Sequence, residues 1–238
     1  MVIPTFNEKE NIGVLIKKIQ DVFEEGEIEG SILVIDDNSP DGTAEVAGEM
    51  ASRYGNIRIL KRKGKLGLGS AYREGFGIAL RTMKADIVFE MDADLSHDPS
   101  FIPEFIRRLN EGCEMVVGSR HIPGGKIQGW SLYRHLVSST ANTLAKTALD
   151  LGVSDVTTGF RAYRAETLRK IKYETIDSES YGFQIETLFR CARRGLRVGE
   201  VPITFKDRRA GASKLGKKEI LQFIGNVCRL FVTRLTGW

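Results

Sequence analysis

Asp92 and Asp94 follow directly on an apolar, β-prone run at residues 86–91. On an extended chain, residues spaced i and i+2 point to the same face, so we expect the two carboxylates to lie side by side at the end of a buried strand. Neighbouring acids repel each other and resist desolvation, and a divalent cation removes both penalties. Hard cations such as Mg²⁺ or Mn²⁺ prefer oxygen ligands. The pair therefore predicts a metal site completed by water and a substrate's phosphates, with an ordinary acidic loop as the alternative.

A second acidic pair, Asp36-Asp37, ends another apolar, β-branched run. Strand-like and helix-like segments alternate at short intervals through this half, which is typical of an open, mostly parallel α/β sheet. Strands are expected at residues 1–3, 31–35, 57–60, 86–91 and 115–118, with helices opening after Asn7 and Asp41 and at about residues 70 and 101. Ligands of such sheets bind at the carboxyl ends of the strands. Both acidic pairs are expected at that edge, which favours a shared site.

Two local patterns concern helix starts. Asn7 and Glu10 have the spacing of a capping box. Residues 61–69 form a basic, glycine-rich loop before a helix, and a helix start of this kind can hold phosphate. Tyr72 stands where the third glycine of a dinucleotide-binding fingerprint belongs, and no G-x-x-x-x-G-K-[ST] occurs. Dehydrogenase and kinase functions therefore lose their main support.

Charge is divided unevenly along the chain. Residues 1–118 have a net charge of −7 and residues 119–238 a net charge of +11. An acidic half with metal ligands and a basic half with anion contacts suit a phosphate-bearing substrate or a membrane surface, although scattered solvated charges are the alternative. The basic half is expected to contain helices at 131–149 and 183–194, strands at 155–163 and 197–205, and a loop at 206–218. That loop, rich in Lys and Arg, is expected to be a lid over a phosphorylated substrate or a solvated linker.

The tail from residue 219 to 238 has apolar positions at helical spacing between basic residues. Such a helix suits a membrane interface or a membrane-anchored partner, and packing on the protein's own core is the alternative. No run of about 18 apolar residues and no secretory signal is visible, so the sequence predicts neither a membrane span nor export. Three widely spaced cysteines without a Cys-x-x-Cys pair fit a reducing, cytoplasmic setting.

Eight motifs together resemble glycosyltransferase family 2 with the GT-A fold, and within it the polyprenol-phosphate mannose synthases, especially the soluble type of dolichyl-phosphate mannose synthase. The motifs are Ile3–Glu8, Ile35–Thr43, Lys65–Gly69, Met91–His97, Gly118–Arg120, Thr158–Arg161, Gly199–Ile203, and Arg208 with Ser213–Gly216. The resemblance covers essentially the whole chain. It implies a GT-A domain, an α/β Rossmann-like open sheet flanked by helices, at residues 1–216, followed by a C-terminal amphipathic helix at 217–238.

The resemblance also implies an activity and its partners. Mannose would pass from GDP-mannose to a dolichyl or other polyprenyl monophosphate, with inversion at the sugar carbon and with Mg²⁺ or Mn²⁺. The protein would lie peripherally on the cytoplasmic face of a plasma membrane or endoplasmic reticulum, on the membrane surface or on a small membrane-anchored subunit. Another nucleotide sugar such as UDP-glucose is the alternative donor. A non-enzymatic nucleic-acid-binding module is disfavoured, because base-stacking aromatic residues are sparse in the basic loops.

Matching positions imply roles for individual residues. Guanosine would be held by Pro4, Phe6, Glu8, Ile35 and Asp37. Diphosphate would meet Asp92, Ala93 and Asp94, and the ion would be surrounded by Asp92, Asp94 and Ser96. Phosphate charge would be met by Arg120, Arg208 and Lys214, which with Asp94 are the expected catalytic residues, while Arg134 and Ser138 would face the lipid phosphate. The chain departs from the family at Phe6, where Tyr is usual, and at Ser139, where Arg often follows the serine.

A phosphate nucleophile arrives deprotonated, so the sequence predicts no general base. Glu186 is the one candidate for that role, and a structural salt bridge is the expected alternative.

Overall fold

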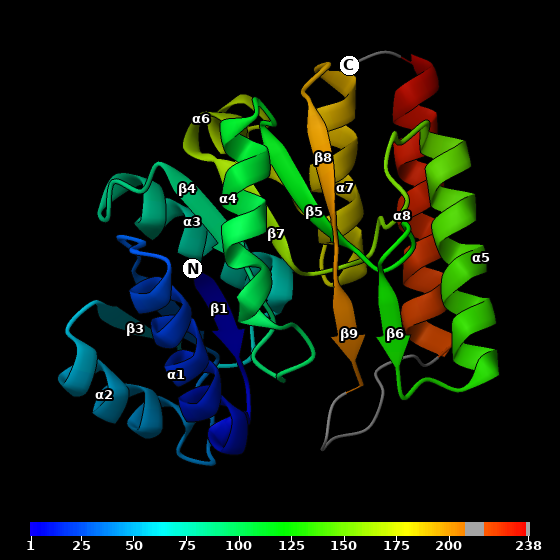
Figure 1. Cartoon of the computed structure of the whole chain (residues 1–238). Helices are drawn as coiled ribbons and strands as arrows, with labels where there is room; N and C mark the ends of the chain where they lie inside the picture. Colours follow the sequence, from blue (N-terminus) through cyan, green and yellow to red (C-terminus); the bar gives the residue numbers. More distant parts are fainter. Residues whose placement is uncertain (208–216, 237–238) are drawn as a thin grey trace.

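The computed structural model describes residues 1–207 and 217–236, with side chains in the second range from residue 221 onward. In this part of the chain seven strands form one sheet in the order β3-β2-β1-β4-β7-β5-β8 (Figure 1). Their bounds are β1 Val2–Thr5, β2 Ile32–Asp36, β3 Ile57–Lys61, β4 Ile87–Glu90, β5 Met115–Ser119, β7 Arg161–Arg164 and β8 Val198–Pro202. Only β7 runs antiparallel to its neighbours, so the prediction of a mostly parallel sheet is confirmed.

The chain reverses its direction across the sheet at β1. From β1 it proceeds to β2 and β3 on one side, and β4 then pairs on the other side of β1. Such a switch point leaves a crevice beyond the carboxyl ends of the strands, where ligands of open α/β sheets bind. Asp92 and Asp94 follow β4 at this place.

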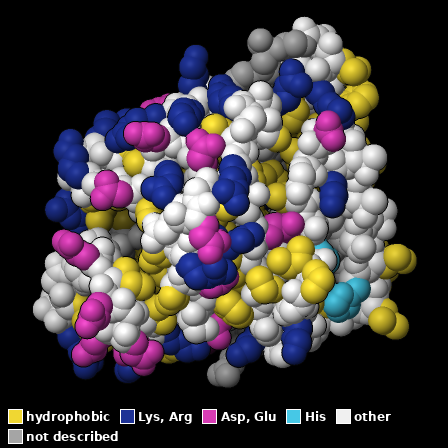
Figure 2. All heavy atoms as spheres, turned by 45° about the horizontal axis from the view of Figure 1, so that its top comes forward, with side chains coloured by type: hydrophobic (Ala, Val, Ile, Leu, Met, Phe, Trp, Pro, Cys, Tyr) yellow, Lys and Arg dark blue, Asp and Glu magenta, His cyan; other side chains and the backbone are white. Residues whose placement is uncertain are grey.

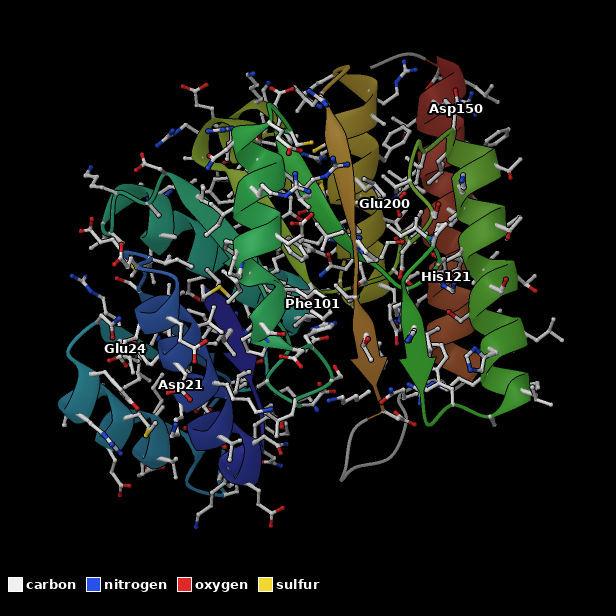
Figure 3. The ribbon with its side chains drawn as sticks, in the orientation of Figure 1. Asp21, Glu24, Phe101, His121, Asp150 and Glu200 are labelled. Atoms are coloured by element: carbon white, nitrogen blue, oxygen red, sulfur yellow. The ribbon has the colours of Figure 1, made fainter. Side chains whose placement is uncertain are left out.

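Helices cover both faces of the sheet. Their bounds are α1 Lys9–Glu25, α2 Thr43–Tyr54, α3 Leu68–Arg81, α4 Ile102–Asn110, α5 Leu132–Leu149, α6 Ala165–Lys170, α7 Tyr181–Arg193 and α8 Lys217–Thr236, with short 3₁₀ turns at Pro99–Phe101 and Tyr173–Thr175. Alternate residues of β2 enter different cores: Ile32 and Val34 pack with α1, and Leu33 and Ile35 pack with α3. Charged side chains such as Asp21 and Glu24 project from the outer side of α1 (Figure 3).

The predicted capping box at the start of α1 is wrong. Asn7 has a left-handed backbone with φ 59°, and the N-cap residue is Glu8, whose side chain bonds the Asn11 side chain and makes no capping bond to the helix backbone. The backbone N–H groups of this turn are satisfied from the loop after β2: Asn7 N donates to Ser39 Oγ, Glu8 N to Thr43 Oγ1 and Lys9 N to Asp41 Oδ2. The loops after β1 and β2 therefore form one hydrogen-bonded unit.

Two strand predictions in the basic half are wrong in extent. Residues 155–160 form a loop before β7, and the predicted strand at 197–205 is two strands, β8 and β9 (Thr204–Lys206). Strand β9 pairs with β6 (Lys126–Gln128) in a small parallel sheet. The sequence did not predict β6, because it follows a glycine-rich stretch around residue 124. The paired strands bring residue 207 beside Gln128, whose carbonyl accepts the N–H of Asp207.

Helices α5 and α8 lie side by side at the edge of the molecule (Figure 1). One face of α8 is buried in the core through Phe223, Val227 and Leu230, while Leu221 and Leu235 remain 70% and 69% exposed. Hydrophobic side chains also stand out at the edge where α5 lies, beside a histidine (Figure 2). None of the helices in the described ranges is long and apolar enough to cross a membrane.

Candidate active site

The acidic motif lies in a turn and not on a strand. β4 ends at Glu90, and the Oδ1 atom of Asp94 accepts the backbone N–H of Ser96 at 3.1 Å. Leu95 between them has φ 62°, a left-handed conformation that costs about 1 kcal/mol or more for a non-glycine residue. Both carboxylates line the same cavity. The expected convergence of Asp92 and Asp94 is therefore present, but it is produced by a strained turn instead of strand alternation.

His97 packs against this turn and contacts Asp92. Its side chain is 1% exposed, and its Nδ1 atom lies 3.4 Å from the backbone N of Asp92 and 3.8 Å from Asp92 Oδ2. Burial lowers the pKa of His97, although Asp92 and Asp94 oppose the shift. The ring also packs on Phe160 and Phe205. A neutral imidazole in this position accepts the Asp92 N–H, so its role is to position the turn.

Gly159 approaches the first aspartate from the opposite loop. A Cβ atom at residue 159 would lie only 3.0 Å from Asp92 Oδ2, so a larger residue there would push the carboxylate out of its position. Its loop is held by Arg161, a fully buried residue that donates to the backbone carbonyls of Thr158 and Val156 at 2.9 Å each. The Thr158–Arg161 motif thus fixes one wall of the site.

The residues present fit a divalent cation. Asp92 and Asp94 offer hard oxygen ligands, and the Ser96 Oγ atom is buried with no hydrogen-bond partner in the described part of the chain. A buried hydroxyl without a partner is costly, and a cation ligated by its oxygen would remove this cost. No group of three or more His, Cys, Asp or Glu residues suited to a metal occurs among residues 1–207 and 221–236. Water and substrate phosphates are the remaining ligands that the sequence predicts.

Arg120 is fixed by a buried ion pair. Its Nε and Nη2 atoms donate to the two carboxylate oxygens of Asp155 at 2.6 and 2.8 Å, and its backbone N–H bonds the same carboxylate at 3.0 Å. Thr157 accepts a further bond from Nη2, and the rings of Trp130 and Phe205 lie 5.4 and 5.3 Å from the guanidinium carbon. Burial alone would raise the pKa of Asp155, but the charge and hydrogen bonds of Arg120 outweigh it and hold the pKa at about 2. The pair is therefore charged at neutral pH.

Arg134 lies in the first turn of α5, which Ser131 caps by accepting the Arg134 N–H. Its Nη1 atom contacts both carboxylate oxygens of Asp207, at 2.8 and 2.9 Å, and its guanidinium carbon lies 4.2 Å from the Trp130 ring centroid. Ser138 follows one turn later and lines the same cavity. The two residues predicted to face a lipid phosphate are thus neighbours on one helix face.

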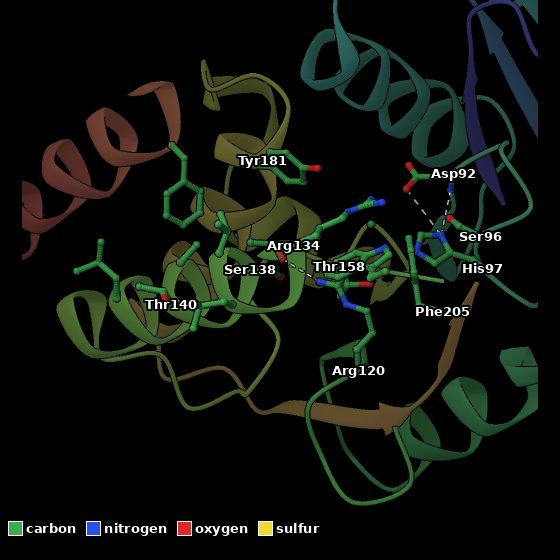
Figure 4. A pocket seen from close by; sticks show the side chains of 18 of the residues that line it. Asp92, Ser96, His97, Arg120, Arg134, Ser138, Thr140, Thr158, Tyr181 and Phe205 are labelled. Carbon is green, nitrogen blue, oxygen red and sulfur yellow. Dashed lines mark hydrogen bonds and ion pairs between the residues drawn. The ribbon is translucent and has the colours of Figure 1, made fainter. Parts of the chain in front are cut away.

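A cavity of about 480 Å³ joins these parts. Asp92, Ser96 and His97 lie on one side of it, and the side chain of Arg134 extends toward them, while Arg120 lines the same cavity (Figure 4). The remaining wall is apolar and comes from α5 and α8: Leu136, Val137, Ala141, Leu144, Phe223 and Ile224. The cavity is therefore charged at one end and hydrocarbon-lined at the other.

The five residues predicted to hold a nucleoside lie apart from this cavity, around the carboxyl ends of β1 and β2. They are Pro4, Phe6, Glu8, Ile35 and Asp37. Asp37 is buried, and it accepts Arg62 Nε at 2.6 Å and the backbone N–H groups of Leu66 and Gly67 at 3.1 and 3.4 Å. Lys65 lies over the Phe6 ring at 4.2 Å. Asp37 thus fixes the basic loop beside Phe6. Ile35 is fully buried in the core between β1 and β3, so the structure gives a ligand no exposed surface of this residue.

Other predictions have different outcomes. The amides expected to hold phosphate at the start of α3 already bind a carboxylate, because Gly69 N and Ser70 N donate to Glu179 at 2.7 and 3.1 Å. Glu186 is bonded to Ser178, Arg190 and Arg229, as expected of a structural salt bridge. Ala93 is buried beside the two aspartates. Arg208 and Lys214 lie outside the described residues.

Comparison with known proteins gives a family, relatives and folds. The model of the family described as "Glycosyl transferase family 2" matches residues 1–172. The chain is 40% identical over 228 residues to undecaprenyl-phosphate mannosyltransferase of Micrococcus luteus, covering 96% of this chain and 91% of that protein. It is 39% identical over 221 residues to polyprenol monophosphomannose synthase of Mycolicibacterium smegmatis, covering 92% and 82%.

Solved structures share the fold at lower identity. Glucosyl-3-phosphoglycerate synthase of Mycobacterium tuberculosis in complex with Mn²⁺, UDP and phosphoglyceric acid superimposes with a TM-score of 0.69, at 22% identity, over 96% of this chain and 76% of that chain. The same enzyme with Mn²⁺ and UDP-glucose gives a TM-score of 0.67, at 23% identity, over 98% and 77%.

Proposed function

This chain belongs to glycosyl transferase family 2, and from that premise we propose that it transfers mannose from GDP-mannose to a dolichyl or other polyprenyl monophosphate, with inversion at the anomeric carbon. The product would be a lipid-phosphate-mannose donor for glycosylation. Two relatives named for mannose transfer to polyprenyl phosphates, at 40% and 39% identity over most of the chain, support this substrate class.

One observation carries the proposal: the amphipathic cavity. A polyprenyl monophosphate has a charged head and a hydrocarbon chain, and the cavity offers Arg120 and Arg134 to the first and an apolar wall of α5 and α8 to the second. A water-soluble acceptor would gain no binding free energy from that wall. Burial of apolar surface contributes about 25 cal/mol per Å², and only a ligand with apolar surface can gain it. The carboxylates of Asp92 and Asp94 line the same charged end of the cavity as the two arginines.

In the proposed reaction a phosphate oxygen of the lipid attacks the anomeric carbon while the bond from that carbon to the GDP β-phosphate oxygen breaks. A phosphate monoester carries about −1.5 to −2 charges at pH 7, so no base is needed to deprotonate it. Arg120 and Arg134 bind and orient the attacking group, and Asp155 keeps Arg120 in place. Asp92, Asp94 and Ser96 would hold Mg²⁺ or Mn²⁺, which supplies positive charge to the leaving diphosphate.

The nucleoside would lie at the ends of β1 and β2, between Phe6 and the loop that Asp37 fixes. This location adjoins the acidic turn across the switch point, because β1 lies between β2 and β4. The expected contributions of Arg208 and Lys214 remain predictions from the sequence.

We further propose that the protein acts at the cytoplasmic surface of a membrane that holds the lipid acceptor. Support comes from exposed apolar side chains at the start of α5, where Leu132 is 89%, Tyr133 71% and Leu136 68% exposed. Leu136 also lines the cavity, so the apolar surface continues into the proposed lipid site. A small membrane-anchored subunit is the alternative contact, and copurification from membranes tests for it.

The test is transfer of radiolabelled mannose from GDP-mannose to a short-chain polyprenyl phosphate, with and without EDTA. We expect a lipid-linked product that disappears with EDTA and returns with excess Mg²⁺ or Mn²⁺, and a β-linked mannose by proton NMR. Equal or faster transfer of glucose from UDP-glucose would replace the proposed donor. Transfer to a water-soluble acceptor in place of the lipid would reject the proposed acceptor.

A further inference from the structure

The two arginines of the cavity are held in different ways. Asp155 is fully buried and bonds three different nitrogen atoms of Arg120, one of them in the backbone. The Asp207 side chain is 30% exposed and bonds Arg134 through the Nη1 atom alone. The first pair is built into the fold, because its loss would leave a buried charge. The second pair lies at the cavity's edge, where replacing the carboxylate by another anion costs much less free energy.

Arg134 has unused hydrogen-bonding capacity in this arrangement. Its Nε atom is buried and has no hydrogen-bond partner in the part of the chain that the structure describes. A guanidinium presents Nε and one Nη as a fork that matches two oxygens of a phosphate or carboxylate. Asp207 does not use this fork, since both of its oxygens contact Nη1. Because the Nε atom is buried, another anion can engage this fork only when the guanidinium moves, and that movement breaks its contacts with Asp207.

We propose that Asp207 is an internal competitor that occupies Arg134 until the phosphate of the acceptor displaces it. This inference rests on the proposed function, because it takes a lipid monophosphate as the anion that reaches Arg134. Asp207 keeps the guanidinium neutralised and positioned over Trp130 while the site is empty of substrate. A phosphate group with up to two negative charges and three oxygens engages the fork and takes the place of the carboxylate.

A competitor weakens the binding of every ligand for which it must be displaced. Asp207 is therefore expected to lower the affinity for the acceptor phosphate and for the phosphodiester product alike, and so to speed product release. This sign distinguishes it from a residue that merely orients Arg134, whose removal would weaken binding. Asp155 is such an orienting residue for Arg120, so the same substitution at the two sites should act in opposite directions.

The experiment compares Asp207→Asn with the wild-type chain. Binding of a short-chain prenyl monophosphate is followed by the fluorescence of Trp130, which contacts Arg134, and KM and kcat are measured for transfer. We expect about two- to tenfold tighter binding and a lower KM for the prenyl phosphate, with kcat unchanged or reduced by slower release. Arg134→Ala should weaken binding, and in its background Asp207→Asn should have no further effect.

A matched control is Asp150→Asn, which removes a surface ion pair with Arg234 at the far end of α5 (Figure 3). It should change neither binding nor KM. Weaker or unchanged binding in Asp207→Asn would overturn the proposal, as would an effect that persists without Arg134. Failure of the proposed function is a separate result, since the wild-type chain would then transfer no mannose, whereas the binding experiment still reports the sign of the Asp207 effect.

Discussion

The edge of the sheet at β1 and β2 and the cavity under α5 and α8 are built on different principles. At the first, carboxylates are closed in short networks: Asp36 bonds Thr5 and Ser39, and Asp41 bonds Thr43 and the start of α1. At the second, the decisive contacts join residues far apart in the chain, such as Arg134 and Asp207, 73 positions apart. The nucleoside side is thus held by contacts that span about 30 positions of the chain, while the acceptor side also depends on a contact that spans more than twice as many. Substitutions should therefore affect the two sides differently.

The largest effect is expected where both sides meet, at the acidic turn. Asp94→Ala removes a proposed ligand of the cation that neutralises the leaving diphosphate, so kcat should fall by about 10²–10³-fold or more. Steady-state mannose transfer at saturating Mg²⁺ or Mn²⁺ measures it. Asp98→Ala, four residues on, removes only a cap that accepts the Ser100 N–H and should leave turnover near normal. Near-normal turnover of Asp94→Ala would reject the proposed metal site.

The next largest effect concerns the stability of the acceptor side. Asp155→Asn leaves the buried Arg120 without its counter-charge, so the free energy of unfolding should fall by about 3–5 kcal/mol at pH 7. Because the folded-state pKa of Asp155 is about 2, below its unfolded value, the contribution is complete above about pH 4 and is lost as the pH falls toward 2. Urea denaturation of both proteins at pH 7 and pH 3 tests this. A gap between them that stays constant or grows at pH 3 contradicts the assignment.

The structure of the acidic half could be predicted from the sequence better than the structure of the basic half. The mostly parallel sheet and the position of the acidic pairs at its carboxyl edge could be predicted, because both follow from local patterns. These patterns are the apolar runs that end in Asp36-Asp37 and Asp92/Asp94. The Asn7–Glu10 capping box failed, because residues 39–43 supply the helix start from a distance. β6 was missed because its partner β9 lies more than 70 residues away.

The residues of the candidate site show the same difference between predicted and missed features. Asp92, Asp94, Ser96, Arg120, Arg134 and Ser138 come together in one cavity, as expected of a shared site. The ion-pair partners Asp155 and Asp207 were not identified, since ion pairs between distant residues leave no spacing pattern. His97 had one available signal, its place five residues after Asp92 in the acidic motif. The basic charge of the second half was visible, but not that aspartates neutralise Arg120 and Arg134.

A smaller effect is expected on the nucleoside side. Asp37→Asn weakens the attachment of the 62–67 loop, which depends on Arg62 and two backbone amides. We expect the KM for GDP-mannose to rise about tenfold, with the KM for the lipid phosphate nearly unchanged, because one or two hydrogen bonds to a charged group are worth about 1.5–3 kcal/mol. Glu45→Gln, which removes a surface ion pair with Lys61 in the same region, is the control. An equal rise in both KM values would show that the two sides are not independent.

The smallest effect should leave the chemistry untouched and change only access to the lipid. Leu132→Ser with Tyr133→Ser removes two side chains exposed by 89% and 71% at the start of α5. Binding to vesicles of neutral and anionic phospholipid should weaken several-fold, because the two side chains, buried only in part in an interface, together contribute on the order of 1 kcal/mol. Turnover with a short, water-soluble prenyl phosphate should stay the same. Val14→Ser, on α1 and 48% exposed, is the matched control and should bind vesicles like the wild-type chain. If both variants lost vesicle binding equally, the apolar end of α5 would not be the membrane contact, and the hydrocarbon wall of the cavity would have to be reached from α8 alone.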